Sequence, residues 1–116
     1  MEQHLYPAPS AEVSQKRRDL APEIYAAFRS FSQRVFADGA LPSKTKELIA
    51  VAVAHVTQCP YCIRSHTRRA TMKGATAQEI MEAIWVAAEM RAGAASAHSA
   101  LAIDEMAQEP TNPGSQ

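Results

Sequence analysis

The sequence predicts an all-α protein, and three observations support this prediction. Apolar residues recur at spacings of three and four residues, as they do on one face of a helix. No segment alternates apolar and polar residues over a useful length, as a half-buried strand would. Proline, glycine and capping residues divide the chain into segments of helical length. We therefore expect a bundle of about five to six helices, with a Cys-x-x-Cys motif at the start of a central helix.

The first half of the chain contains three expected helices. Helical spacing begins at Ser10, and Pro22 fits the first position of a second helix, which the Asp-Gly pair at residues 38–39 ends. A Pro-Ser pair at residues 42–43 starts the third helix. Residues 48–56 of this helix include a single polar side chain, so we expect it to be buried on every side.

The second half contains the remaining helices. One runs from Pro60 to about Lys73 and is ended by Gly74. The sequence Thr-Ala-Gln-Glu at residues 76–79 is a capping box that opens the next, which carries Trp85 on its apolar stripe as a core or subunit contact. A separate helix rich in Ala and Ser is expected from residue 93 to about residue 107, and its small side chains suit close packing against another subunit.

The two ends of the chain differ in composition from its middle. Residues 1–9 contain two prolines and little apolar content, and residues 109–116 contain two prolines, a glycine and small polar residues. Both segments are typical of flexible tails. Residues 10–108 are then expected to form a single helical domain, which is small enough to benefit from a partner subunit.

The charge balance argues against two classes of partner. Twelve Lys and Arg residues balance twelve Asp and Glu residues, so no net field gathers nucleic acid or an anionic membrane. The longest apolar run, residues 48–54, is far shorter than the about 20 residues that cross a bilayer. The start lacks a basic stretch followed by an apolar one. We therefore expect a cytoplasmic protein, in which thiols stay reduced.

The chemistry of the chain is concentrated in Cys59, Cys62 and His66. On a helix these residues lie at azimuths of roughly 0°, −60° and −20°, which places them on one face. Cys59 is expected at the N-cap and Cys62 in the first turn, where free backbone N–H groups and the helix dipole favour a thiolate. His66 lies one turn beyond Cys62, so its imidazole can accept the thiol proton or stabilise the anion.

Glu47 stands twelve residues before Cys59, at the start of the apolar run. Small side chains at Ala50 and Ala54 follow on the same face and would let another helix approach closely. If the cysteine helix folds back along this one, Glu47 meets it across the hairpin. The alternative is a solvated carboxylate in a first helical turn, where the dipole favours negative charge.

Other interpretations of the cysteine pair remain open at this point. The pair could be half of a zinc site, although the sequence has no second Cys-x-x-Cys and no His-x-x-x-His. It could also be two buried structural cysteines. His55 and His98 lie in apolar or small-residue segments and are expected to be hydrogen-bonded core or interface histidines outside the site.

The arrangement Glu47-x11-Cys59-Pro60-Tyr61-Cys62-x3-His66 resembles the Glu-x11-Cys-x-x-Cys-x3-His signature of AhpD-like alkylhydroperoxidases, which belong to the carboxymuconolactone decarboxylase superfamily. The similarity extends over roughly residues 40–90, through Lys46-Glu47-Leu48-Ile49-Ala50-Val51-Ala52, Ala70, Gly74, Glu79-Ile80 and Glu82-Ala83.

The resemblance implies an AhpD-like helical bundle that assembles into trimers or hexamers and acts as a thiol-dependent peroxidase. It makes Cys62 the peroxidatic thiol, Cys59 the resolving thiol, His66 the base at Cys62, and Glu47 a carboxylate acting through His66. In the best-studied branch a histidine precedes the second cysteine, whereas this chain has Tyr61, which puts any relay through that histidine in doubt.

The leading hypothesis is therefore an antioxidant enzyme that reduces a hydroperoxide through a dithiol–disulfide cycle, with no bound cofactor or metal. Its expected partners are the hydroperoxide, a lipoyl-bearing or thioredoxin-like thiol reductant, and further copies of the chain. One alternative is the decarboxylation of a muconolactone, the superfamily's namesake activity, although that reaction calls for no thiols. Another is a non-enzymatic redox-sensing or zinc-binding module.

Overall fold

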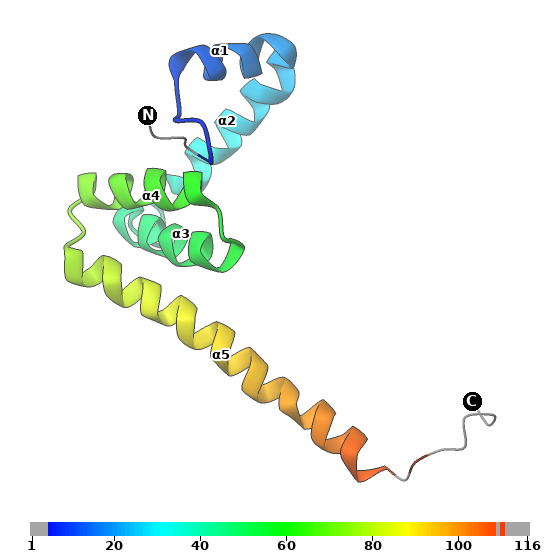
Figure 1. The fold of residues 1–116 in the computed structure, drawn as a ribbon. Helices are drawn as coiled ribbons and strands as arrows, with labels where there is room; N and C mark the ends of the chain where they lie inside the picture. The colour runs from blue at the N-terminus through cyan, green and yellow to red at the C-terminus, as the bar shows by residue number, and fades with distance from the viewer. Residues whose placement is uncertain (1–4, 109, 111–116) are drawn as a thin grey trace.

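The computed structural model describes residues 5–108 and Pro110, and this part of the chain forms five α-helices and no strand (Figure 1). The helices are α1 (Ala11–Leu20), α2 (Pro22–Phe36), α3 (Ser43–Thr57), α4 (Pro60–Met72) and α5 (Ala77–Ala107). The predicted all-α class and number of helices are confirmed. Of the two expected tails, residues 1–4, 109 and 111–116 lie outside the described residues.

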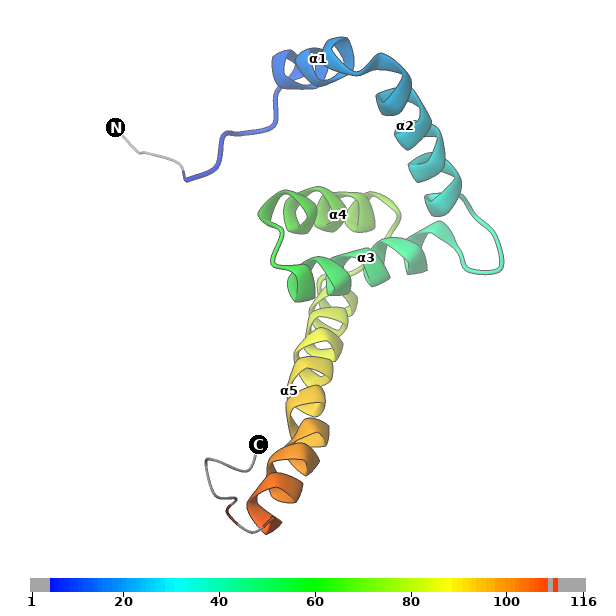
Figure 2. The same cartoon turned by 90° about the vertical axis from the view of Figure 1, so that its right-hand side faces the viewer.

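α3 is the central element, because both α4 and α5 pack against it (Figure 2). α4 folds back along α3, and α5 leaves this pair on the side away from α1. The core between the three helices is small: Val51, Ala70 and Ala75 are buried, and three half-buried side chains pack around them, Leu48, Ile80 and Ile84. The α3–α4 hairpin and the start of α5 thus enclose the core.

α1 and α2 form an arm that extends from this hairpin (Figure 1). The radius of gyration is 21.0 Å, whereas a compact domain of about this length has one of about 13 Å. The arm exposes large apolar side chains along α2, namely Ile24, Phe28, Phe31 and Val35. The extended shape therefore leaves apolar surface that the chain does not cover itself.

Local sequence explains where the helices begin. The Ser10 hydroxyl accepts a hydrogen bond from the Val13 N–H (3.1 Å) and caps α1, and Pro22 occupies the first turn of α2. The Asp38 carboxylate accepts a bond of 2.7 Å from the N–H of Ser43, which satisfies a free donor at the start of α3.

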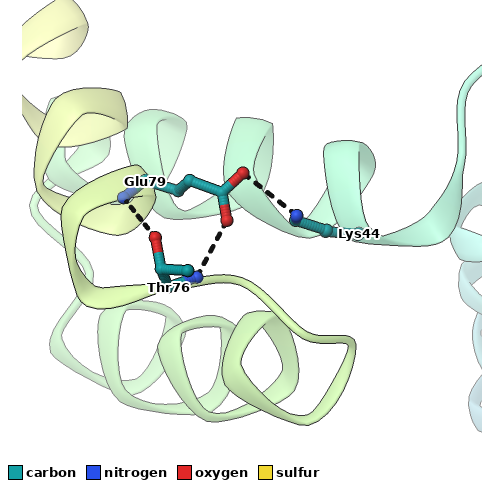
Figure 3. A network of polar contacts seen from close by, with 3 residues as sticks. All are labelled: Lys44, Thr76 and Glu79. Atoms are coloured by element: carbon teal, nitrogen blue, oxygen red, sulfur yellow. Dashed lines mark hydrogen bonds and ion pairs between the residues drawn. The ribbon is translucent and has the colours of Figure 1, made fainter.

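Figure 3 shows the capping box that starts α5 and its link to α3. The Thr76 hydroxyl accepts from the Glu79 N–H (3.1 Å), and the Glu79 carboxylate accepts from the Thr76 N–H (2.9 Å). The same carboxylate pairs with the Lys44 ammonium of α3 at 3.0 Å. The capping box predicted from residues 76–79 is confirmed, and the ion pair fixes the start of α5 beside α3.

Two expectations about the helices are wrong. No helix begins near Gly93, because α5 is continuous over 31 residues. A glycine costs about 1 kcal/mol in a helix interior, which the Ala-rich flanks tolerate since propagation of a formed helix is favourable. α3 is not buried on every side either: Ile49, Val53 and Val56 are 48%, 51% and 42% exposed, because α4 and α5 cover only one face.

Candidate functional site

The site begins at the α3–α4 turn, where Gln58 adopts a left-handed conformation (φ 58°) and reverses the chain. Cys59 follows as the N-cap of α4, and Pro60 occupies the first turn. The backbone N–H of Cys62 donates to Sγ of Cys59 at 3.3 Å. Both thiols are free and half-buried, and they lie together at the positive end of the helix dipole.

The two cysteines differ in their electrostatic environments. The pKa of Cys59 is lowered, first by the hydrogen bond from the Cys62 thiol and then by the Cys62 backbone N–H. The pKa of Cys62 is raised, because its thiol proton is held by Cys59, because the side chain is partly desolvated, and because Cys59 carries negative charge. Both shifts favour the loss of a proton from Cys59 before Cys62.

Glu47 of α3 and His66 of α4 form the second part of the site. The Glu47 side chain is only 3% exposed, and its Oε2 lies 2.7 Å from Nδ1 of His66. This burial is incompatible with the solvated carboxylate considered as an alternative. With Nδ1–H donating to the carboxylate, the other ring nitrogen, Nε2, is left to accept or donate a proton.

Cys62 and His66 line the same small pocket, of about 150 Å³, against α3. Ala50, Ala54, Val53 and Thr57 complete its wall. A neighbouring apolar depression of about 360 Å³ shares Ala50 and Val53 with it and continues towards the end of α2, where it is lined by Val35, Phe36, Lys46 and Ile49. Cys62 thus faces a space that an apolar molecule could enter along α3, whereas Cys59 is not part of either lining.

One side chain of the site was not predicted from the sequence. Phe36, the last residue of α2, stacks on the imidazole of His66 with ring centroids 5.1 Å apart and an interplanar angle of 28°. In the sequence Phe36 resembles the other apolar residues of its helix. Its partner is thirty positions away, and no spacing rule connects them, so no local signal could have identified it.

Tyr61 lies between the cysteines and contacts the N-terminal segment. Its hydroxyl donates to the Pro7 carbonyl at 2.7 Å, and its ring meets Tyr6 edge-on at 5.8 Å. Where the resembling branch has a histidine, this chain therefore has a side chain that holds residues near its own N-terminus.

The other residues considered from the sequence lie outside the site. His55 donates from Nδ1–H to the Val51 carbonyl (2.7 Å) and is half-buried, as expected. His98 is exposed, and Trp85 is 67% exposed, so in this chain neither belongs to the core. A subunit contact for Trp85 stays a prediction.

Residues 5–108 and Pro110 contain neither a cluster of metal-ligating side chains nor a membrane-spanning helix. No three His, Cys, Asp or Glu side chains there gather in an arrangement that could hold a metal ion. None of the helices in this part of the chain is both long and apolar enough to cross a membrane.

Comparison with known sequences gives matches over most of the chain. The model of the carboxymuconolactone decarboxylase family matches residues 22–105. A Paracoccus denitrificans protein named uncharacterized protein 4 in the cox locus is 59% identical over 97 residues, covering 84% of this chain and 86% of its own. An uncharacterized Cupriavidus necator protein is 33% identical over 82 residues, which are 71% of this chain and 73% of that protein.

Solved structures share the fold, and one of them is described as a member of the same family. A carboxymuconolactone decarboxylase family protein from Legionella pneumophila is 40% identical with a TM-score of 0.65, over 68% of this chain and 70% of its own. A Methanobacterium thermoautotrophicum protein is 38% identical with a TM-score of 0.67, over 73% and 94%. A Thermotoga maritima protein shares the fold at 23% identity and a TM-score of 0.63, over 88% and 100%.

Proposed function

Since this chain belongs to the carboxymuconolactone decarboxylase family, we propose that it is the thiol-dependent peroxidase, of the AhpD-like kind, that its cysteine pair suggests. The observation that carries the proposal is the buried Glu47–His66 pair beside Cys62. A carboxylate that holds one imidazole nitrogen leaves the other to move a proton at the sulfur, which is how a thiol is activated as a nucleophile.

The first half of the cycle oxidises Cys62. The Cys62 thiol gives its proton to His66, and the thiolate attacks the hydroperoxide, so that an S–O bond forms as the O–O bond breaks. The departing alkoxide takes the proton from His66 and leaves as an alcohol. Cys62 is then a sulfenic acid, oxidised by two electrons, and the peroxide has been reduced by two.

The second half uses Cys59. The Cys59 thiolate attacks Sγ of Cys62, an S–S bond forms, the S–O bond breaks, and hydroxide leaves as water after taking a proton. Two thiols of an external reductant, a lipoyl-bearing or thioredoxin-like protein, then restore both cysteines by disulfide exchange. The lowered pKa of Cys59 suits this role, because a resolving thiol must be ionised to attack.

The assignment of Cys62 as the first nucleophile rests on access and on acid–base assistance. Cys62 shares a pocket with His66, and Cys59 does not. General acid–base catalysis is typically worth ~10²–10⁴-fold, whereas a helix terminus stabilises a charge by only ~0.3–1 kcal/mol. The raised pKa of Cys62 makes its proton acceptor more important, since little thiolate forms without one.

The proposal is tested by following consumption of hydrogen peroxide and of an organic hydroperoxide, with dihydrolipoamide or reduced thioredoxin as the electron donor. Native protein should consume the peroxide over many catalytic cycles, and the Cys62→Ser chain should not. In the Cys59→Ser chain, peroxide should leave a sulfenic acid on Cys62 that a sulfenate-specific reagent traps. A sulfenate trapped on Cys59 in the Cys62→Ser chain at the native rate would reverse the two roles.

The other candidate functions give different results in the same samples. A zinc-binding module would purify with stoichiometric metal, and its thiols would titrate only after the metal is removed. A redox sensor would oxidise once without turnover, and a decarboxylase would remain active in Cys62→Ser. His55→Ala, which alters a histidine outside the site, is the control and should leave turnover unchanged.

A further inference from the structure

We propose that Phe36 is a positioning residue that fixes the plane of the His66 imidazole for reaction at Cys62, an inference that rests on the proposed function. The stack of Phe36 on His66, with centroids 5.1 Å apart and planes at 28°, joins α2 to the site that α3 and α4 form. Phe36 does not line the pocket of Cys62, so it acts through the histidine.

The Glu47 carboxylate alone cannot fix the imidazole. One hydrogen bond, from Nδ1 to Oε2 at 2.7 Å, sets the direction of one ring edge but still permits some rotation about the Cβ–Cγ bond, because a carboxylate oxygen accepts over a broad range of directions. A flat aromatic surface against the ring removes this remaining rotation, because offset-stacked rings prefer near-parallel planes. Glu47 therefore sets the direction of the imidazole, and Phe36 sets its plane, so that the ring keeps one orientation at the pocket that His66 lines together with Cys62.

The structure holds Phe36 in place more firmly than its neighbours on α2. Phe28 and Phe31 are 63% and 64% exposed, whereas Phe36 is half-buried. Directly after Phe36, the Ala37 carbonyl accepts a hydrogen bond of 2.6 Å from the Lys46 ammonium. Lys46 precedes Glu47 on α3, so the segment that presents the carboxylate also secures the end of α2.

A second bond strengthens the same connection. The carboxylate of Asp38 accepts a hydrogen bond of 2.7 Å from the N–H of Ser43, which joins the segment between α2 and α3 to the first residue of α3. Ser43 itself is buried. Phe36 thus precedes a connection that two hydrogen bonds hold in place. A ring held in this way can orient a catalytic imidazole at little further cost in conformational entropy.

The test compares three variants in the Cys59→Ser chain, where Cys62 is the only thiol. Phe36→Leu keeps an apolar side chain but removes the ring, Phe36→Tyr keeps the ring, and Phe31→Leu makes the same change on the same helix away from the site. Two quantities are measured: the rate of Cys62 alkylation by iodoacetamide, and the proton chemical shifts of the His66 ring. His66→Ala gives the alkylation rate without the imidazole.

Phe36→Leu should slow alkylation by roughly tenfold, most of the way to the His66→Ala rate, because a misaligned base loses much of its effect. The His66 ring protons should also lose the upfield shift that a stacked aromatic ring causes. Phe36→Tyr and Phe31→Leu should keep the native rate of Cys62 alkylation and the native chemical shifts of the His66 ring. Native alkylation in Phe36→Leu, or equal loss in Phe36→Tyr, would overturn the inference.

These readouts separate the inference from the proposed function. Alkylation and chemical shifts need no peroxide, so a chain that fails to reduce peroxide can still show the effect of Phe36 on His66 and Cys62. Conversely, if native protein reduces peroxide and Phe36→Leu does so at the native rate with native alkylation, the peroxidase stands and the role of Phe36 falls.

Discussion

The two cysteines shift each other's pKa in opposite directions. The Cys62 thiol and the Cys62 N–H both donate to Sγ of Cys59, so negative charge is stabilised on Cys59 and opposed on Cys62. Two sulfurs that interact in this way titrate as a pair, in two steps. The first step gives the Cys59 anion, which the proposed cycle uses as the resolving thiolate, and the second gives the Cys62 anion.

The thiolate absorbance of the native dithiol should therefore rise in two steps, one below and one above the ordinary thiol pKa of 9.0. Cys62→Ala removes the thiol donor but keeps the backbone N–H, so the Cys59 step should move up in pH. Cys59→Ala removes the neighbouring acceptor and charge, so the Cys62 step should move down. A single step at an unchanged pH in all three chains would show that the sulfurs do not interact.

A second substitution tests the negative charge of Glu47 beside His66. Glu47→Gln can still accept from His66 Nδ1 but carries no charge to stabilise the imidazolium, so the first oxidation of Cys62 should slow roughly tenfold to a hundredfold with the fold unchanged. Stopped-flow oxidation gives the rate, and circular dichroism checks the fold. An unchanged rate would leave Glu47 as a structural partner of His66.

Glu79 stabilises the start of α5 through the capping box with Thr76. The pKa of this carboxyl is lowered, first by the Thr76 backbone N–H and then by Lys44. A carboxyl with a lowered pKa in the folded state contributes stability above its unfolded pKa, near 4.5, and loses it as the pH falls through the lowered value.

Glu79→Gln should consequently have a lower melting temperature than the native chain at pH 7, and the difference should shrink as the pH is lowered below about 4.5. Thermal unfolding at several pH values measures this. Glu82→Gln, an exposed carboxylate on the same helix, is the control. A difference that persists unchanged into strong acid would exclude ionisation of Glu79 as the cause.

The elements also show what sequence patterns could and could not predict. The capping box at Thr76 and the N-cap at Cys59 are local signals, so the helix starts were predictable. The continuity of α5 through Gly93 was not, because one glycine weighs little against a long helix that is already formed. The Phe36–His66 stack was not predictable either, since it depends on how α2 meets the α3–α4 hairpin.

Burial was predicted least well, because it depends on which other helices cover each face of a helix. An apolar helix such as α3 predicts that something covers it but not what does. α4 and α5 cover the face of Val51, and the face of Val53 stays open in this chain. Val51 is the largest side chain that is fully buried in the described part of the chain, which is a small core for a chain of this length.

We therefore expect a homo-oligomer, a trimer or hexamer by the family resemblance, in which the apolar side of α2 is covered. Light scattering should give a mass several times 12.6 kDa. Phe28→Glu should lower that mass, because it places a charge on this surface, whereas Gln33→Glu adds the same charge at a polar position and should not. A native chain that is monomeric at micromolar concentration would contradict this expectation.

Because Sγ of Cys59 caps α4, the proposed dithiol–disulfide cycle would also change the stability of the start of this helix. Sγ of Cys59 is a weaker acceptor for the Cys62 N–H in a disulfide than as a thiolate, so forming the proposed disulfide would weaken this bond at the start of α4. Interactions that favour the dithiol over the disulfide raise the reduction potential of the couple. In the proposed cycle we therefore expect the disulfide to be reducible by a mild dithiol donor.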